Sequence, residues 1–236
     1  MSSANFLSGG IYSFKNNITG YFDLRDENNV LVEENIRLRK KIEGLKDVTS
    51  FKAIDSNLPI PSAYIFIAAE VINNNYSKTK NKLTLDKGII DSIKIDMGVI
   101  TSKGIVGIVN RVSKNYATVQ SILNTNSQIN ARLKNSNHFG SLIWNTEEPN
   151  TVQLIDVNRL APVKVGDTII TGGKSTIFPE GILIGTIKEF KLGENDNYDL
   201  DIQLFNDMTN LRHVYVIENT DAPEIIVLEK AEEDAE

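Results

Sequence analysis

The spacing of hydrophobic residues changes along the chain, from every seventh position near the N-terminus to every second position beyond residue 62. Between residues 21 and 46 leucines recur at intervals of seven, and neither Pro nor Gly interrupts the stretch from Tyr21 to Glu43. A seven-residue apolar repeat is typical of helices that pair as a coiled coil. We therefore predict a coiled-coil dimerisation helix over residues 14–48, preceded by a flexible N-terminus over residues 1–13.

One seam position of this repeat carries leucine, and the other carries Tyr, Asn or Ile. An Asn in the seam of a parallel pair bonds its counterpart and fixes the register at a cost in stability. Glu34 and Arg39 have the spacing of an interchain ion pair in such a dimer. The predicted dimerisation residues are Leu24, Asn28, Leu31, Asn35, Leu38, Ile42 and Leu45. An amphipathic helix that packs on its own domain is the alternative.

Residues 49–62 form a predicted linker, because Pro59 and Pro61 cannot both lie inside a helix. Beyond them, short runs of alternating apolar and polar residues recur along the chain, separated by Gly, Asn and Asp. This pattern predicts antiparallel strands in small barrels or sandwiches. No long helical pattern separates the runs, so a parallel sheet with crossover helices is not expected.

A weak internal repeat lies within this β-rich part. Residues 95–109 and residues 165–187 each carry an apolar pair before a Thr, then a Gly, then a strand with a Gly of its own. A Gly inside a short strand marks a bulge or a tight corner. Two related β-domains are therefore predicted, at residues 63–130 and 131–220, and chance similarity is the alternative. Residues 221–236 form an acidic tail, for which an edge strand or a short helix is expected.

The composition excludes several kinds of functional site. The chain has no Cys and only two His, His138 and His213, so neither Cys-ligated metal nor a His-rich site is expected. The net charge of −6 resides in the tail, which has seven acids and one Lys, so the rest of the chain is neutral and has no basic field for nucleic acid. No apolar run approaches the roughly 18 residues of a membrane span, and no signal peptide is evident. No metal and no cofactor is expected.

Two motifs invite a catalytic interpretation, and we discount both. Gly173-Lys174-Ser175-Thr176 resembles the end of a phosphate-binding loop, but Thr168 stands where that motif requires Gly, and Pro179 would fall inside its helix. We expect a turn there instead. A serine-protease-type site would use Ser175 or Ser141 with His138 or His213, but no Gly-flanked nucleophile accompanies them. Asp167 is expected to cap a turn and Trp144 to fill a core.

Several blocks of residues, taken in order, resemble the MreC family of cell-shape-determining proteins, most closely its Bacteroidetes branch. The blocks are Tyr21-Phe22-Asp23-Leu24, Glu34-Asn35-Ile36-Arg37-Leu38, Leu85-Asp86-Lys87-Gly88, Met97-Gly98-Val99-Ile100-Thr101, Gly104-Ile105-Val106-Gly107-Ile108-Val109, Gly140-Ser141-Leu142-Ile143-Trp144, Val165-Gly166-Asp167-Thr168-Ile169-Ile170-Thr171-Gly172 and Phe178-Pro179-Glu180-Gly181-Ile182-Leu183-Ile184-Gly185. The resemblance covers Tyr21 to Asn219. Gly172-Gly173 and Asp91-Ser92 depart from the usual Ser-Gly and Asp-Gly, and the family's N-terminal membrane span does not occur in this sequence.

The resemblance implies a mainly β fold, with a coiled-coil helix followed by two small six-stranded antiparallel β-barrels. It implies a non-enzymatic scaffold of the rod complex, which maintains cell shape by organising peptidoglycan synthases. The implied partners are penicillin-binding protein 2, RodA, MreD and the MreB system, beside a second copy of the chain and possible higher assemblies. The implied location is the inner membrane, with a single span outside this chain and this part in the periplasm. A double-barrel hydrolase and a soluble adaptor are the alternatives.

One loop is a candidate partner surface. Residues 174–180 carry Ile177 and Phe178 beside Pro179, which is unusual apolar content for a turn. We predict a partner contact at Ile177 and Phe178, and the alternative is that both side chains pack beneath their own loop.

Replacing Leu31 and Leu38 with Ala tests the coiled coil. Each seam leucine contributes roughly 1.5–3 kcal/mol on burial, and the two Asn layers oppose association, so the parent pair should be on the order of micromolar. The double variant should lose pairing through the helix and keep its barrels folded, as sedimentation equilibrium and circular dichroism would report. Replacing Asn28 and Asn35 with Leu should instead tighten association and relax its stoichiometry. If the Ala variant associates as strongly as the parent, the helix does not mediate pairing.

Overall fold

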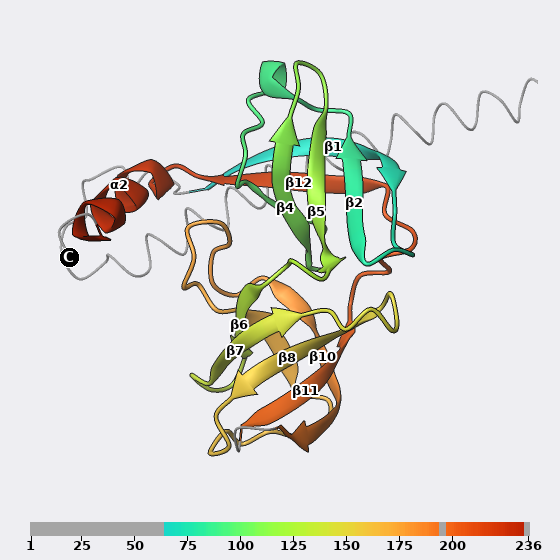
Figure 1. The fold of residues 1–236 in the computed structure, drawn as a ribbon, viewed down its shortest axis with the longest axis vertical. Helices are drawn as coiled ribbons and strands as arrows, with labels where there is room; N and C mark the ends of the chain where they lie inside the picture. The colour runs from blue at the N-terminus through green and yellow to red at the C-terminus, as the bar shows by residue number, and fades with distance from the viewer. Residues whose placement is uncertain (1–63, 194–196, 234–236) are drawn as a thin grey trace, which may run out of the picture. The chain divides into compact units, whose positions relative to one another are not determined.

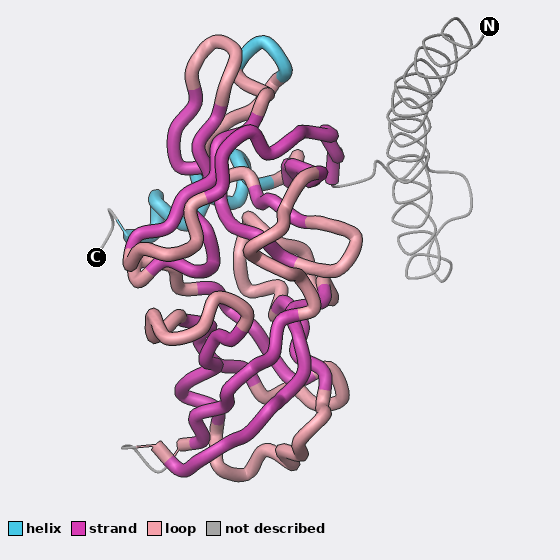
Figure 2. Tube along the Cα trace, turned by 90° about the vertical axis from the view of Figure 1, so that its right-hand side faces the viewer, coloured by secondary structure: helices cyan, strands magenta, loops and turns pink. Residues whose placement is uncertain are grey.

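The computed structural model describes residues 64–193 and 197–233, so the predicted coiled-coil helix and linker lie outside the described residues. The described part forms two closed β-barrels of six strands each (Figure 1). Strand dominates both barrels, and the helical elements within the described residues are one short turn and one C-terminal helix (Figure 2). The prediction of a mainly β protein with two six-stranded antiparallel barrels is therefore confirmed.

The first barrel combines five strands from the start of the described chain with one from its end. These strands are β1 (Tyr64–Asn74), β2 (Lys80–Leu85), β3 (Gly98–Ile100), β4 (Ile105–Val112), β5 (Ala117–Asn124) and β12 (His213–Asn219), with the 3₁₀ turn η1 (Ile89–Asp91) between β2 and β3. The second barrel contains β6 (Ile129–Leu133), β7 (Phe139–Ile143), β8 (Thr151–Val157), β9 (Thr168–Thr171), β10 (Leu183–Leu192) and β11 (Tyr198–Leu204). Helix α2 (Ala222–Glu233) follows β12.

The period-two pattern of the sequence decides which side chains fill each barrel. On β2, Leu83 and Leu85 are buried while Lys80 and Lys82 are exposed, because successive side chains of a strand point to opposite faces. On β12 the four residues Val214–Ile217 are all buried, so both faces of this strand are covered. Buried and exposed residues therefore alternate on a strand with one face in solvent, such as β2, and do not alternate on β12, whose two faces are both covered.

The two barrels share one strand order, with their last strands exchanged. In the first barrel β12 lies between β1 and β3, and in the second β6 occupies the corresponding place between β7 and β9. Strands β1–β5 correspond in order to β7–β11. The predicted repeat is therefore present as two related six-stranded units, each of which supplies its sixth strand to the other barrel.

This exchange changes the predicted domain boundaries. We assigned residues 131–220 to the second barrel, but β12 pairs with β1 from Tyr64↔Asn219 to Glu70↔His213, and it pairs with β3 as well. The second barrel is thus inserted between β5 and β12 of the first. Local patterning cannot reveal this, because the apolar run of β12 marks a buried strand without indicating its partners, which are far away in the sequence. For the tail, an edge strand or a short helix was expected, and the structure has a helix, α2.

A pair of glycines marks the corresponding bulges of the two units. A Cβ built on Gly107 of β4 would lie 2.1 Å from the carbonyl oxygen of Gln120, and one on Gly185 of β10 would lie 2.1 Å from that of Gln203. Both glycines therefore allow a neighbouring strand to approach more closely than any side chain permits. The two contacts occupy corresponding places, on the fourth strand against the fifth.

Replacing Gly185 with Ala should therefore destabilise the protein. The new methyl group must displace the backbone of β11, at a cost of about 1–3 kcal/mol of unfolding free energy, beyond what a Gly-to-Ala change costs where space is open. Gly166, which has φ of +89° and no atom within 4 Å of an added Cβ, is the matched control, because its Ala variant has only backbone strain. Urea unfolding of both variants measures the difference. An equal loss for both would contradict the steric argument.

Candidate functional site: the junction of the two barrels

Two of the sequence blocks that carry the family resemblance, Met97–Thr101 and Phe178–Gly185, meet where the two barrels join, and Gly104 of a third block lies there too. Phe178, from the loop between β9 and β10, is 3% exposed and packs against β3 and β12 of the first barrel. A Cβ built on Gly98 would lie 2.7 Å from Cε1 of Phe178 and 3.0 Å from Cγ1 of Ile217. Gly98 therefore provides the room that the phenyl ring occupies, and the loop of one barrel packs against the wall of the other.

A buried asparagine also joins the barrels. Asn206 lies in the connection from β11 to β12 and is 5% exposed. Its Nδ2 donates to the carbonyl oxygen of Ile105 at 2.8 Å, and its Oδ1 accepts from Thr101 Oγ1 at 2.5 Å. A buried amide is stabilising only when its donors and acceptors are paired, and here both ends of the side chain are used. The connection between the barrels is thus fixed to the turn between β3 and β4.

A close backbone approach completes the junction. A Cβ built on Gly104, at the start of β4, would lie 2.4 Å from the carbonyl oxygen of Leu183 at the start of β10. Any side chain at position 104 would push β10 away from the first barrel. The block Met97–Thr101 with Gly104 therefore supplies one side of the junction, and the block Phe178–Gly185 supplies the other.

The loop that carries Phe178 is held as a turn rather than as a phosphate-binding helix. Thr171 Oγ1 donates to the carbonyl oxygen of Pro179 at 2.6 Å and accepts from the backbone of Ile182 at 2.9 Å, which ties the two ends of the loop together. Ser175 Oγ accepts from the backbone of Ile177, and Lys174 Nζ lies 3.9 Å above the ring of Phe139. No helix begins at Lys174. The expectation of a non-helical loop after Gly173, closed by a turn at Pro179–Gly181, is confirmed.

The two residues of the candidate partner surface have different environments. Phe178 is buried in the junction, whereas Ile177 beside it is half-buried at the surface of the loop. Only Ile177 presents apolar area that a partner could cover without separating the barrels. The partner contact stays a prediction, and the dimerisation residues Leu24, Asn28, Leu31, Asn35, Leu38, Ile42 and Leu45 lie outside the described residues.

The serines and histidines do not assemble a hydrolytic triad in the part of the chain that the structure describes. His138 Nδ1 lies 3.0 Å from Ser136 Oγ, two residues away in the same turn, and no carboxylate is bonded to the other ring nitrogen. Ser141 Oγ accepts from Gln128 instead. His213 Nδ1 lies 4.0 Å from a carboxylate oxygen of Glu70, and no serine bonds to that ring. A nucleophile, a base and an orienting acid never occur together here.

Two carboxylates have clearly shifted acidities, and both shifts favour the charged form. The hydroxyl of Thr151, followed by Lys188, lowers the pKa of Glu148, and the hydroxyl and the backbone of Thr209 lower the pKa of Asp207. A general acid at neutral pH needs a raised pKa instead.

Two further residues have the roles that the sequence predicts. Asp167 accepts from the backbone of Lys164 at 3.0 Å, so its predicted turn-capping role is confirmed. Trp144 is 6% exposed, as a core residue should be.

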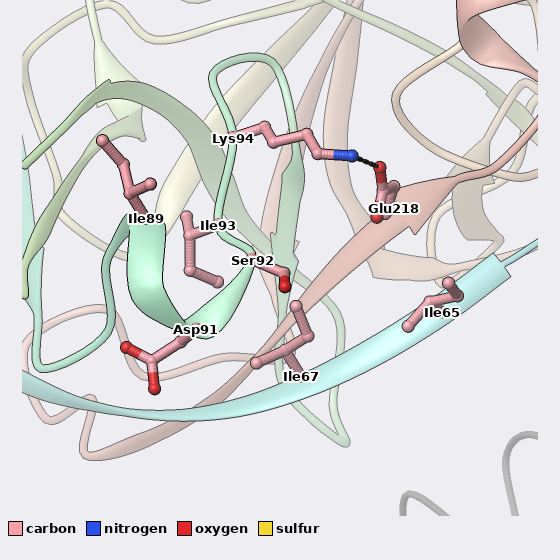
Figure 3. A pocket seen from close by; sticks show the side chains of 8 residues that line it. All are labelled: Ile65, Ile67, Ile89, Asp91, Ser92, Ile93, Lys94 and Glu218. Carbon is pink, nitrogen blue, oxygen red and sulfur yellow. Dashed lines mark hydrogen bonds and ion pairs between the residues drawn. The ribbon is translucent and has the colours of Figure 1, made fainter. Parts of the chain in front are cut away.

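The first barrel also carries an apolar groove. It has a volume of about 530 Å³, its walls include Ile65, Ile67, Ile89 and Ile93, and an ion pair of 2.5 Å between Lys94 and Glu218 crosses one end (Figure 3). No group of three metal-binding side chains occurs among the described residues, and none of the described helices could cross a membrane. The contacts described above hold the two barrels together, and within the described residues they form neither a catalytic triad nor a metal site.

Sequence analysis did not identify the junction. Asn206 is 105 residues from Thr101, so no local signal reveals that the two side chains meet. Gly98 and Gly104 were recognised as members of a resembling block, but the contacts that require a Gly there come from the other barrel.

Replacing Phe178 with Ala should destabilise the whole described unit. Removing a buried phenyl ring leaves a cavity and costs about 3–5 kcal/mol of unfolding free energy. Phe205, which is 37% exposed, is the control, and its Ala variant should lose less, about 1–2 kcal/mol, because part of its ring is already in solvent. Urea unfolding monitored by circular dichroism measures both. If the two variants lose the same amount, the ring does not hold the junction.

Comparison with known proteins identifies the fold and the family. The family model described as "Rod shape-determining protein MreC, barrel core" matches residues 71–218. The cell shape-determining protein MreC of Listeria monocytogenes is 28% identical over 229 residues, which cover 92% of this chain and 75% of the relative. A solved structure of MreC from the same species superposes with a TM-score of 0.66 at 25% identity, and covers 85% of this chain and 95% of its own.

Two further structures are similar in fold. The major periplasmic domain of the "cell shape-determining filament MreC" has a TM-score of 0.58 at 23% identity and covers 66% of this chain and 97% of its own. MreC from Helicobacter pylori, solved in complex with penicillin-binding protein 2 (PBP2), has a TM-score of 0.54 at 14% identity, and covers 66% of this chain and 98% of its own. The match of the family model to more than half of the chain shows that this chain belongs to the MreC family of rod shape-determining proteins, which are non-enzymatic structural proteins.

Proposed function

We propose that this chain is the periplasmic part of a scaffold that organises peptidoglycan synthases during cell elongation, and that PBP2 is its direct partner. The observation that carries the proposal is the junction itself. Residues of three of the resembling blocks, together with Asn206, hold the two barrels against each other. A scaffold needs surfaces held at a fixed spacing, and a rigid junction supplies that.

The relatives support the partner and the compartment. MreC of Helicobacter pylori forms a complex with PBP2, and another MreC is described as a periplasmic domain. By the same resemblance, RodA, MreD and the MreB system are the further members of the assembly. We place the chain at the inner membrane, held by a single span outside this sequence, as a homodimer through residues 14–48.

The loop over residues 174–180 is the surface that we assign to the partner. Ile177 is the apolar side chain that this loop leaves accessible, while Phe178 anchors the loop from beneath. Such an arrangement of a rigid support with one exposed apolar contact is what a protein interface requires at its centre. Phe178 therefore acts by positioning Ile177.

Replacing Ile177 with Asp should weaken binding to the PBP2 of the same organism at least about tenfold, because a charge replaces an apolar contact at the centre of the interface. Leu160, on the same barrel and 81% exposed, is the matched control, and its Asp variant should bind as the parent does. Surface plasmon resonance with immobilised PBP2 measures the affinities. If the parent binds PBP2 and both variants bind equally well, the loop is not the partner surface. If the parent does not bind, PBP2 is not a direct partner.

A further inference from the structure

Strand β10 extends beyond the barrel that it helps to close. Its pairing with β9 ends at Thr186↔Thr168, and the last bonds on that side join the backbone of Ile187 to Gly166 and Asp167. Residues Lys188–Leu192 continue the strand and pair only with β11, from Glu189↔Asp201 to Leu192↔Tyr198. All five are exposed. Among the described residues, none bonds to the outer edge of this segment.

The backbone groups that this edge presents can be assigned from the hairpin. Gly193 donates to the carbonyl oxygen of Asn197 at 2.7 Å, so residues 193 and 197 form a hydrogen-bonded pair. Antiparallel pairs alternate between bonded and non-bonded, which makes 191↔199 bonded and makes 190↔200 and 192↔198 non-bonded. The N–H and C=O groups of Phe190 and Leu192 therefore point away from β11, toward the open edge.

The equivalent hairpin of the first barrel, β4–β5, has a covered tip. In the turn between these strands, the carbonyl oxygen of Ser113 accepts from the backbone of Ile89 at 3.0 Å and that of Lys114 accepts from the backbone of Ile90 at 3.2 Å, so η1 packs on the tip. Gly88 permits this contact, since a Cβ there would lie 2.5 Å from the Ser113 oxygen. In the second barrel, the backbone bonds between the equivalent connection, residues 158–167, and β10 are those at Ile187. Among the described residues, no turn like η1 bonds to the β10–β11 hairpin beyond that point.

The sequence of the open edge is complementary to itself. In an antiparallel pair of two copies centred on Phe190, each Glu189 faces Lys191 of the second copy, and the two Phe190 residues face each other. This register makes Phe190 a bonded pair, as its outward backbone groups require, and makes the two Glu–Lys pairs non-bonded, which brings their side chains closest. Centring one residue away would instead oppose two Glu189 or two Lys191 side chains.

We propose that this edge is an interface between two copies of the chain, in which Lys188–Leu192 of one copy pairs antiparallel with the same residues of the other. The contact is isologous, since the same residues serve on both sides. It would also cover apolar area at the rim of the second barrel, where Phe190 is 39% and Leu192 is 55% exposed. Lys and Glu on an edge strand disfavour indiscriminate pairing, and here they permit one register.

Charge reversal tests the interface, because antiparallel pairing predicts which variants complement each other. Glu189→Lys alone or Lys191→Glu alone places like charges opposite each other twice and should weaken association about tenfold. The double variant Glu189→Lys/Lys191→Glu, which has the parent's composition, should regain it. An equimolar mixture of the two single variants should also associate like the parent, since each Lys then meets a Glu.

The measurement is sedimentation velocity over a concentration series. It uses the full chain and a full chain carrying Leu31→Ala and Leu38→Ala, in which the predicted helix pairing is removed. Lys191 also faces Asp199 within its own hairpin, so the mixture, rather than either single variant, decides between pairing across copies and a local effect. If the mixture associates no better than the single variants, or if all variants match the parent, the proposal is overturned.

Disulfide trapping provides an independent test, because the chain has no native Cys. A mixture of a Glu189→Cys chain with a Lys191→Cys chain should form a disulfide-linked heterodimer in excess over either homodimer, since positions 189 and 191 face each other and the second Glu–Lys pair is retained. Phe205→Cys, at an exposed position off the edge, is the control and should give no enrichment. Equal yields of disulfide-linked dimer for the mixture and the control would contradict the pairing. Protection of the Phe190 amide from hydrogen exchange that does not depend on protein concentration would contradict it too, because another segment of the same chain would then occupy the edge.

Discussion

Closure of each barrel by a strand from the other half of the chain is the constraint on which the rest of this structure depends. Neither half of the described chain can close its own barrel in this arrangement, because β12 completes the first and β6 completes the second. Two connections, from β5 to β6 and from β11 to β12, therefore cross between the barrels. A single linker between two domains would leave their relative orientation free, whereas two crossings at one place restrict it before any side chain contributes.

The junction residues act within that constraint. Asn206 lies on one of the two crossing connections, and its bonds to Ile105 and Thr101 fix that crossing to the first barrel. Phe178 does the same for a loop of the second barrel, in the space that Gly98 leaves. A buried amide with both ends paired is specific because any shift leaves a donor or an acceptor unsatisfied, and a buried ring resists displacement because a cavity would remain. The polar contact therefore specifies the arrangement and the apolar contact stabilises it.

How much of this the sequence could predict depends on the range of each interaction. The period-two alternation predicted the β class and the two units. Which face of a strand is buried depends on the strand's own apolar residues, as on β2 with Leu83 and Leu85. The non-helical loop after Gly173 and the cap at Asp167 were predictable for the same reason. The membership of β12 and the role of Asn206 were not, since their partners are about a hundred residues away. Resemblance to MreC supplied the function without supplying those contacts.

Duplication makes the differences between the two barrels informative. The units share strand order and equivalent glycines at Gly107 and Gly185, so a feature that only one of them has was not required by the fold. The η1 turn covers the tip of the β4–β5 hairpin in the first barrel, and in the second barrel no described segment bonds to the outer edge of Lys188–Leu192. Edge strands are an aggregation hazard that natural proteins cap, twist or charge. Here the uncapped edge carries charges that balance only in the antiparallel register centred on Phe190, so the edge is protected from indiscriminate pairing while remaining able to pair with its own copy. In a scaffold, whose function is to hold several proteins in one array, an edge of that kind serves assembly rather than the stability of the single chain.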